Sequence, residues 1–136
     1  MGYEIKLYLG RIHDINAMDE DKEEHYFSVV AWIDLSKPGS NAEILNIDRK
    51  LGQRVYLYGI DGNTRISSDP YGDWLFAIPA KRVLDALRDD WARSKKECKT
   101  WTGYGYRRFY MAIPLLDRFI ETFGPKENPS VVIYGH

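Results

Sequence analysis

The chain has 136 residues, of which 44% are hydrophobic and 29% are charged, with a formal net charge of −1. This composition is typical of a soluble globular domain and excludes a disordered chain or a disulfide-rich scaffold. The near-neutral charge also excludes a global attraction to nucleic acids or membranes, so any such attraction has to be local. Aromatic residues make up 14% of the chain, with ten Tyr and four Trp, and we expect some of these rings to lie at a surface.

The sequence predicts neither a secretion signal nor a membrane anchor. Glu4 and Lys6 interrupt the first apolar stretch, and no run reaches the roughly eighteen apolar residues that a membrane span needs. Cys98 is the only cysteine and has no partner for a disulfide within the chain. We therefore expect a cytoplasmic protein in a reducing compartment.

Two strands are predicted in the N-terminal quarter. Apolar residues alternate with other residues from position 3 to position 10, which is the pattern of a strand with one buried face. Residues 26–33 are mostly β-branched or aromatic on both faces, which predicts a strand nearer the centre of the sheet. If these strands pair, they form a hairpin whose long loop is the acidic stretch 13–25.

A short helix and a hairpin are predicted next. Ser40 and Glu43 have the spacing of a capping box, and Gly52 follows the apolar stripe as a C-cap with positive φ, so we expect a helix over 40–51. Residues 55–60 then predict a strand. The turn Asp61-Gly62-Asn63 leads into a short return strand over 64–67, because Gly and Asn tolerate positive φ.

A strand over 74–78 and a helix beginning at Pro79 are predicted in the third quarter. Proline is tolerated at the first helical position because its missing N–H has no partner there in any case. An apolar stripe at helical spacing runs from Ala80 to Trp91, which places Trp91 in the predicted core.

The tripeptide Ala-Ile-Pro at 77–79 recurs at 112–114, which suggests a second strand-then-helix unit. We expect a strand that ends before Pro114 and a helix from Pro114 to Phe123. The alternative, one helix over 107–123, places Pro114 in the helix interior at a cost of about 3 kcal/mol. A last strand is predicted over 130–134.

Strands outnumber helices in this order of elements, which predicts that residues 1–136 form a single α+β domain. We expect a mixed or antiparallel sheet of about six or seven strands, with two main helices and one short helix packed on it. A parallel pair of strands in the C-terminal half, joined by a right-handed crossover, stays open.

The strongest candidate for a functional site is the segment 91–108. Residues 1–80 hold eight Lys or Arg against thirteen Asp or Glu, whereas residues 81–108 hold nine against four, a local charge of +5. Cations neutralise phosphates, and flat rings stack on unpaired bases, so this mixture suits an anionic partner. The predicted contact residues are Lys96, Lys99, Trp101, Tyr104, Tyr106, Arg107 and Arg108. The competing interpretation is a set of core rings beside a solvated helix end.

The acidic loop is the second candidate. His13, Asp14 and His25 would meet at its mouth, and two imidazoles with a carboxylate can bind a divalent transition metal. Neither an EF-hand nor a His-Glu-x-x-His motif is present, and a loop of like charges is normally hydrated and flexible.

A third candidate is a face formed by Tyr56 and Tyr58, which share one side of a predicted strand. If that side faces outward, the rings are interface anchors, and a homo-oligomer such as a homodimer follows naturally. If it faces inward, the rings fill space beneath the helices.

Together these features predict a small, non-enzymatic binding module that recognises a protein or a nucleic acid through segment 91–108 and needs no cofactor. A metal-assisted hydrolase and a protein inhibitor that docks on a larger machine are the alternatives.

Overall fold

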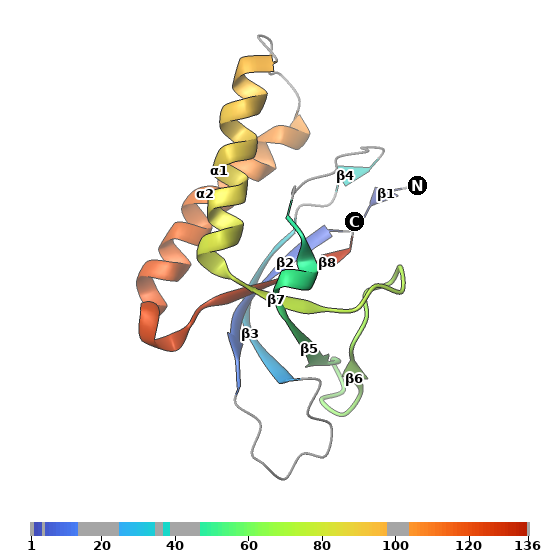
Figure 1. Cartoon of the computed structure of the whole chain (residues 1–136). Helices are drawn as coiled ribbons and strands as arrows, with labels where there is room; N and C mark the ends of the chain where they lie inside the picture. The colour runs from blue at the N-terminus through green and yellow to red at the C-terminus, as the bar shows by residue number, and fades with distance from the viewer. Residues whose placement is uncertain are drawn as a thin grey trace.

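The computed structural model describes residues 2–3, 5–13, 25–34, 37–38, 47–97 and 104–135. The described chain combines two long helices with a six-stranded sheet that closes into a small barrel (Figure 1). The helices are α1 (Ala80–Glu97) and α2 (Tyr104–Phe123). The sheet contains β2 (Ile5–Ile12), β3 (His25–Asp34), β5 (Gln53–Tyr58), β6 (Arg65–Ile66), β7 (Phe76–Pro79) and β8 (Ser130–Gly135). The predicted mixture of helices and sheet is therefore confirmed.

The strand order in this sheet is β3-β2-β8-β7-β5-β6, and the neighbours in this order are antiparallel. Parallel pairing of β3, at one end of this order, with β5, the strand next to the other end, closes the barrel, with Tyr26 opposite Tyr56. The described strands of the C-terminal half contain no parallel pair, because α1 and α2 connect β7 to an antiparallel β8. A separate two-stranded pair is formed by β1 (Gly2–Tyr3) and β4 (Lys37–Pro38).

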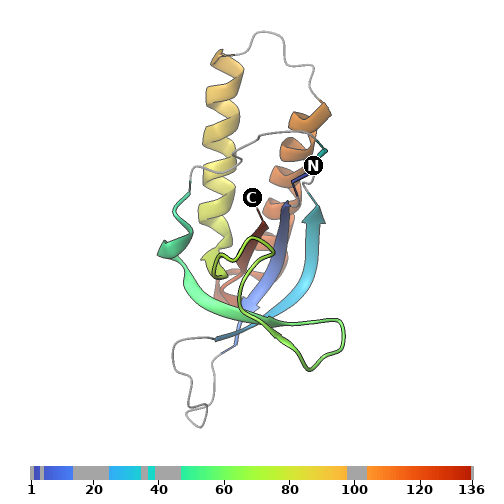
Figure 2. The same cartoon turned by 90° about the vertical axis from the view of Figure 1, so that its right-hand side faces the viewer.

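Apolar side chains line both faces of the barrel wall. One set fills the interior and consists of Phe27, Val55, Leu57, Leu75, Ala77 and Val132. The other set lies between the helices and the outer face of β2, β7 and β8, with Ile5, Leu7, Leu9, Ile78, Val131 and Ile133 from the strands. The two helices lie side by side on this face and leave β5 and β6 on the far side (Figures 1 and 2). Burying such side chains stabilises the fold by about 1.5–3 kcal/mol each.

The N-terminal hairpin, the return strand and the strands on either side of the helices are confirmed. In β2, Ile5, Leu7 and Leu9 are buried, as the alternation predicts, and β2 pairs with β3 in an antiparallel register. The predicted return strand corresponds to β6, and the strands over 74–78 and 130–134 correspond to β7 and β8.

The predicted strand before Pro114 is wrong, because α2 runs without interruption through this proline. Pro114 lies on an exposed side of the helix, while Ala112, Leu116 and Phe119 are buried against the sheet and α1. Burial of this apolar stripe offsets the cost of an interior proline. The two Ala-Ile-Pro tripeptides therefore differ, since Pro79 ends β7 and the helix begins at Ala80.

The central position predicted for the strand over 26–33 is also wrong. Among the described strands, β3 pairs with β2 along most of its length but with β5 only at its first two residues. The barrel closes only where β3 and β5 meet, so Val30 and Trp32 farther along β3 are 53% and 64% exposed.

Of the short helix predicted over 40–51, the described residues contain only the 3-10 turn η1 (Arg49–Leu51). Asp48 caps this turn by accepting a hydrogen bond from the amide of Lys50 at 3.0 Å. Gly52 has a φ of −87°, so the predicted positive φ is wrong. A Cβ at this position would lie 2.5 Å from the carbonyl oxygen of Ala77, so close approach to β7 explains the glycine. Residues 39–46 lie outside the described part of the chain.

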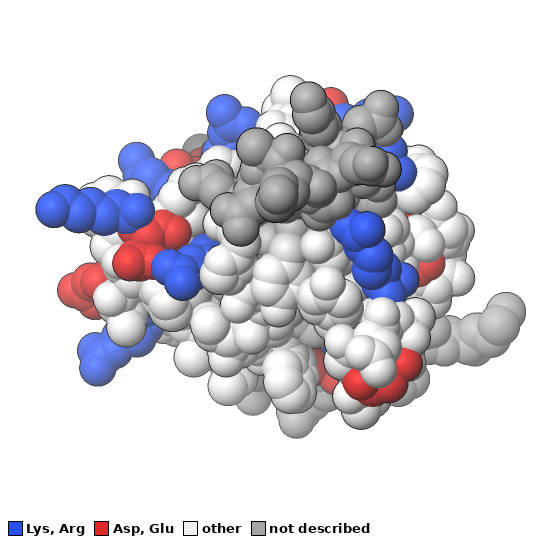
Figure 3. All heavy atoms as spheres, turned by 90° about the horizontal axis from the view of Figure 1, so that it is seen from below, with Lys and Arg blue, Asp and Glu red and all other residues white. Residues whose placement is uncertain are grey.

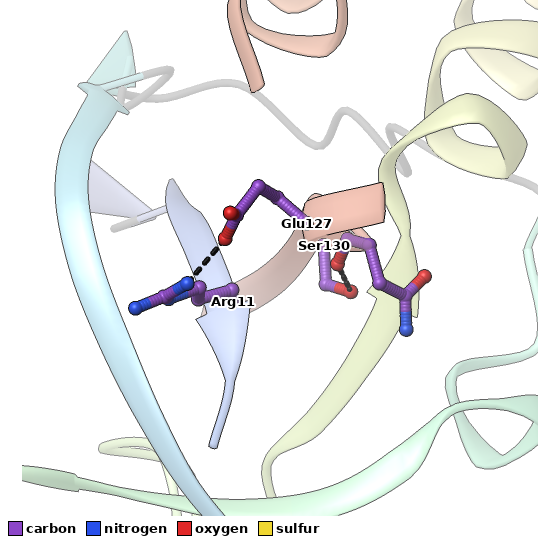
Figure 4. A network of polar contacts seen from close by, with 4 residues as sticks. Arg11, Glu127 and Ser130 are labelled. Carbon is purple, nitrogen blue, oxygen red and sulfur yellow. Dashed lines mark hydrogen bonds and ion pairs between the residues drawn. The ribbon is translucent and has the colours of Figure 1, made fainter. Parts of the chain in front are cut away.

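Polar contacts fix the turn between α2 and β8, which includes η2 (Pro125–Glu127). The guanidinium group of Arg11 in β2 forms an ion pair with Glu127, and the hydroxyl of Ser130 donates to the carbonyl of Asn128 at 3.1 Å (Figure 4). The helical pair is thereby tied to the barrel at its lower end.

Candidate binding surfaces

The structure places most of the predicted contact residues at the ends of the two helices. Lys96 lies in the last turn of α1, and Tyr104, Tyr106, Arg107 and Arg108 lie at the start of α2. Both helix ends point the same way, away from the barrel (Figure 2). Lys99 and Trp101 are outside the described residues. We call positions 93–97 and 104–108 together the helix tip.

An exposed ion pair between α1 and α2 shows which positions of the two helices lie beside each other. Nη2 of Arg88 lies 3.6 Å from Oδ2 of Asp117. Position 97 is as many residues after Arg88 in α1 as position 108 is before Asp117 in α2. Both helices rise about 1.5 Å per residue, so these two distances along the helices are equal. The end of α1 and the start of α2 are therefore level with each other.

This register concentrates basic positions at the helix tip. Positions 93–97 and 104–108 carry five Lys or Arg and one Asp or Glu, a net charge of +4. A local field of one sign attracts counter-charged ligands and raises their local concentration.

The residues of the predicted metal site are not all described. The backbone amide of His13 donates to the carbonyl of Tyr26 at 2.9 Å, and its ring stacks on the Tyr26 ring with centroids 5.2 Å apart. His25 precedes Tyr26 in β3, and the alternation along a strand directs their side chains to opposite faces. Asp14 is outside the described residues, so the site stays a prediction. In the described residues, no three His, Cys, Asp or Glu form a group that could hold a metal ion.

A cluster of rings and cations covers the outer face of β5. Val55 and Leu57 point into the barrel, so Arg54, Tyr56 and Tyr58 point outward. Residues from three other parts of the chain lie against them. We call the whole set the ring face, and its members are Tyr26, Arg54, Tyr56, Tyr58, Arg65 and Trp74.

Two groups of short contacts make up the ring face. The centroids of Tyr26, Tyr56 and Tyr58 are 5.1–5.8 Å apart. The guanidinium carbon of Arg54 lies 3.7 Å from the centroid of Trp74, and that of Arg65 lies 3.6 Å from the centroid of Tyr56. Both distances are well within the range of a cation–π interaction.

Three aromatic residues of the ring face differ in how much of their surface is exposed. Tyr56 is only 5% exposed, whereas Tyr58 and Trp74 are 45% and 53% exposed. Burial raises the pKa of Tyr56, a hydrogen bond with Tyr58 raises it further, and the positive charge of Arg65 opposes both effects. Tyr56 therefore stays protonated at neutral pH and supplies no phenolate for chemistry.

A buried carboxylate holds the loop that carries Trp74. Oδ1 of Asp69 accepts hydrogen bonds from the amides of Tyr71 and Asp73 at 2.8 and 3.0 Å, and Oδ2 lies 4.0 Å from Nη1 of Arg49. Burial lowers the pKa of Arg49, and the charges of Asp69 and Asp73 oppose this shift. Backbone hydrogen bonds from Val55 to Leu75 and from Leu75 to Ser67 connect the loop to β5.

A second carboxylate fixes the turn between β5 and β6. Asp61 accepts hydrogen bonds from the amides of Asn63 and Thr64 at 3.0 and 2.9 Å, and from the Thr64 hydroxyl at 2.6 Å. These bonds lower the pKa of Asp61 to about 2. Asp61 is thus ionised at neutral pH and keeps the turn in one conformation.

The sequence identified only part of the ring face. The outward position of Tyr56 and Tyr58 agrees with one of the two alternatives considered. Arg65 could have been found from the hairpin, because it lies directly opposite Tyr58. The contact with Tyr26 depends on the parallel pairing of β3 with β5, for which the local sequence has no signal.

The surface at the end of the molecule that carries the β5–β6 hairpin is neither uniformly positive nor uniformly negative. Seen from the end at which the β5–β6 hairpin lies, Lys and Arg occur beside Asp and Glu at the margins, and uncharged atoms fill much of the middle (Figure 3). Neither described helix is long and apolar enough to cross a membrane. Comparisons with protein-family models, with curated proteins and with solved structures gave no match.

Proposed function

We propose that the chain is a non-enzymatic binding module that recognises an anionic macromolecule through segment 91–108. The partner is an acidic protein surface or a nucleic acid. One observation carries this proposal, namely the register of α1 and α2, marked by the contact of Arg88 with Asp117, which brings the basic positions of the two helices to the same end of the molecule. The chemistry of these positions, cations interleaved with aromatic residues, suits phosphate or carboxylate groups.

The distribution of charge along the chain supports the same proposal. Segment 91–108 holds six Lys or Arg against one Asp or Glu, a net charge of +5, although the whole chain has a charge of −1. The rest of the chain is therefore negative. Such a polarity orients the molecule toward a polyanion with its basic segment first.

The test replaces two cations of the segment and measures binding to two defined polyanions. Fluorescence anisotropy is recorded with single-stranded DNA and with polyglutamate over a series of NaCl concentrations, for the wild-type protein and for Arg107→Ala/Arg108→Ala. We expect the variant to bind more weakly and the slope of log K against log salt for DNA to fall by about 1.4, because each lost phosphate contact contributes roughly 0.7.

Lys81→Ala/Arg82→Ala is the matched control, because it removes two exposed cations from the other end of α1. Its affinity and salt slope are expected to equal those of the wild type, and melting temperatures of all three proteins should agree closely. The polyanion that binds more tightly identifies the class of partner. An unchanged slope in Arg107→Ala/Arg108→Ala, or no binding to either polyanion at low salt, contradicts the proposal.

A further inference from the structure

The ring face lies on the side of the barrel that the helices leave open, at the opposite end of the molecule from the helix tip (Figure 1). We propose that the ring face is a second docking surface, and that its occupant is a protein segment with carboxylate side chains next to apolar ones. This inference concerns a different surface from the proposed function and does not depend on it.

Exposed rings make this part of the surface unusual. Tyr58 and Trp74 each keep about half of their surface exposed, and Ile60, which follows shortly after Tyr58 in the chain, is fully exposed. Large apolar side chains that gather on a surface mark sites of interaction. Tyr, Trp and Arg, the residue types of the ring face, are also those that contribute most of the binding energy in protein interfaces.

The exposed side chains are carried by fixed turns. Hydrogen bonds to Asp61 hold the β5–β6 turn, and hydrogen bonds to Asp69 hold the loop before β7. A surface that is already ordered loses little conformational entropy on binding, so more of the contact energy appears as affinity.

The charge of the ring face defines the chemistry of its occupant. Arg65 is exposed and lies over the ring of Tyr56, and stacking engages the flat side of its guanidinium group. The N–H donors of a guanidinium lie in its plane and match the two oxygens of a carboxylate. A partner with Asp or Glu beside aliphatic or aromatic side chains therefore complements both this cation and the rings.

A nucleic acid fits this surface less well than a protein does. Residues 47–79, which contribute five of the six members of the ring face, hold four Lys or Arg and four Asp or Glu. Binding to a nucleic acid depends on an excess of cations that neutralise phosphates, and this part of the chain has no such excess.

The experiment selects partners from a phage-displayed library of random linear peptides on the immobilised full chain. A parallel selection uses the variant Arg65→Gln/Trp74→Ala. We expect a consensus with Asp or Glu beside an apolar residue on the wild type and not on the variant. A synthetic peptide with this consensus should bind Arg65→Gln and Tyr58→Ala at least about tenfold more weakly than wild type.

Arg107→Ala/Arg108→Ala is the control, and the peptide should bind it as tightly as it binds the wild type. Arg65 and Tyr58 are exposed, so circular dichroism is expected to show that both single variants are folded. The inference is overturned by the absence of a consensus, by a consensus without acidic residues, or by equal affinity for wild type and both single variants. Displacement of the peptide by single-stranded DNA at physiological salt would instead assign the face to a nucleic acid.

Discussion

Two aspartates hold the turns that carry exposed residues of the barrel surface. Asp61 and Asp69 each accept two backbone hydrogen bonds within their own turn, and each turn carries part of the ring face or a residue next to it. They differ in environment, since Asp61 is exposed and Asp69 is only 5% exposed. Removal of the buried carboxylate is therefore expected to have the larger effect on stability.

Asp69→Ala tests this role of a single residue. The substitution leaves two loop amides without their acceptor and removes one of the two negative charges that act on the partly buried Arg49. We expect the free energy of unfolding, measured by urea denaturation, to fall by about 2–3 kcal/mol. Asp85→Ala, on an exposed position of α1, is the control and should change it by less than about 0.5 kcal/mol. Equal effects of the two substitutions would show that Asp69 does not stabilise the loop.

Helix α2 is the element in which sequence patterns and structure differ most. A proline at position 114 predicts a break, but the helix continues because one of its faces packs in the larger apolar cluster. Propensity is a local quantity, whereas the burial that outweighs it depends on how α2 packs against β2, β8 and α1. The strands of the N-terminal hairpin were predictable because their alternation is itself a consequence of burial on one face.

Neighbouring leucines in α2 test the orientation of this helix. Leu116 is fully buried and Leu115 is 49% exposed. We expect Leu116→Ala to lower the free energy of unfolding by about 2–5 kcal/mol, because it removes packed methyl groups and leaves a cavity. Leu115→Ala should cost about 0.5 kcal/mol or less in the same urea titration. Similar losses for both variants would contradict the packing of α2 described above.

The topology of the molecule places the helix tip and the ring face at different ends. The helical pair extends from one side of the barrel and carries the basic segment, whereas β5 and β6 carry the ring face on the other side (Figure 1). The sequence predicted the basic segment, because charge and aromatic content can be counted along the chain. It could not predict the closure of the barrel or the ring face, because both depend on the parallel contact of Tyr26 with Tyr56 across a long stretch of chain.

The most direct test of the account is an NMR titration of the isotopically labelled full chain with single-stranded DNA and, separately, with polyglutamate. Amide chemical shifts report which end of the molecule meets a polyanion. We predict that at least one polyanion produces its largest shift changes at positions 93–97 and 104–108, and that the changes at the amides of β5 are smaller. Largest changes on β5, or no change with either polyanion at low salt, would contradict the assignment of binding to the helix tip.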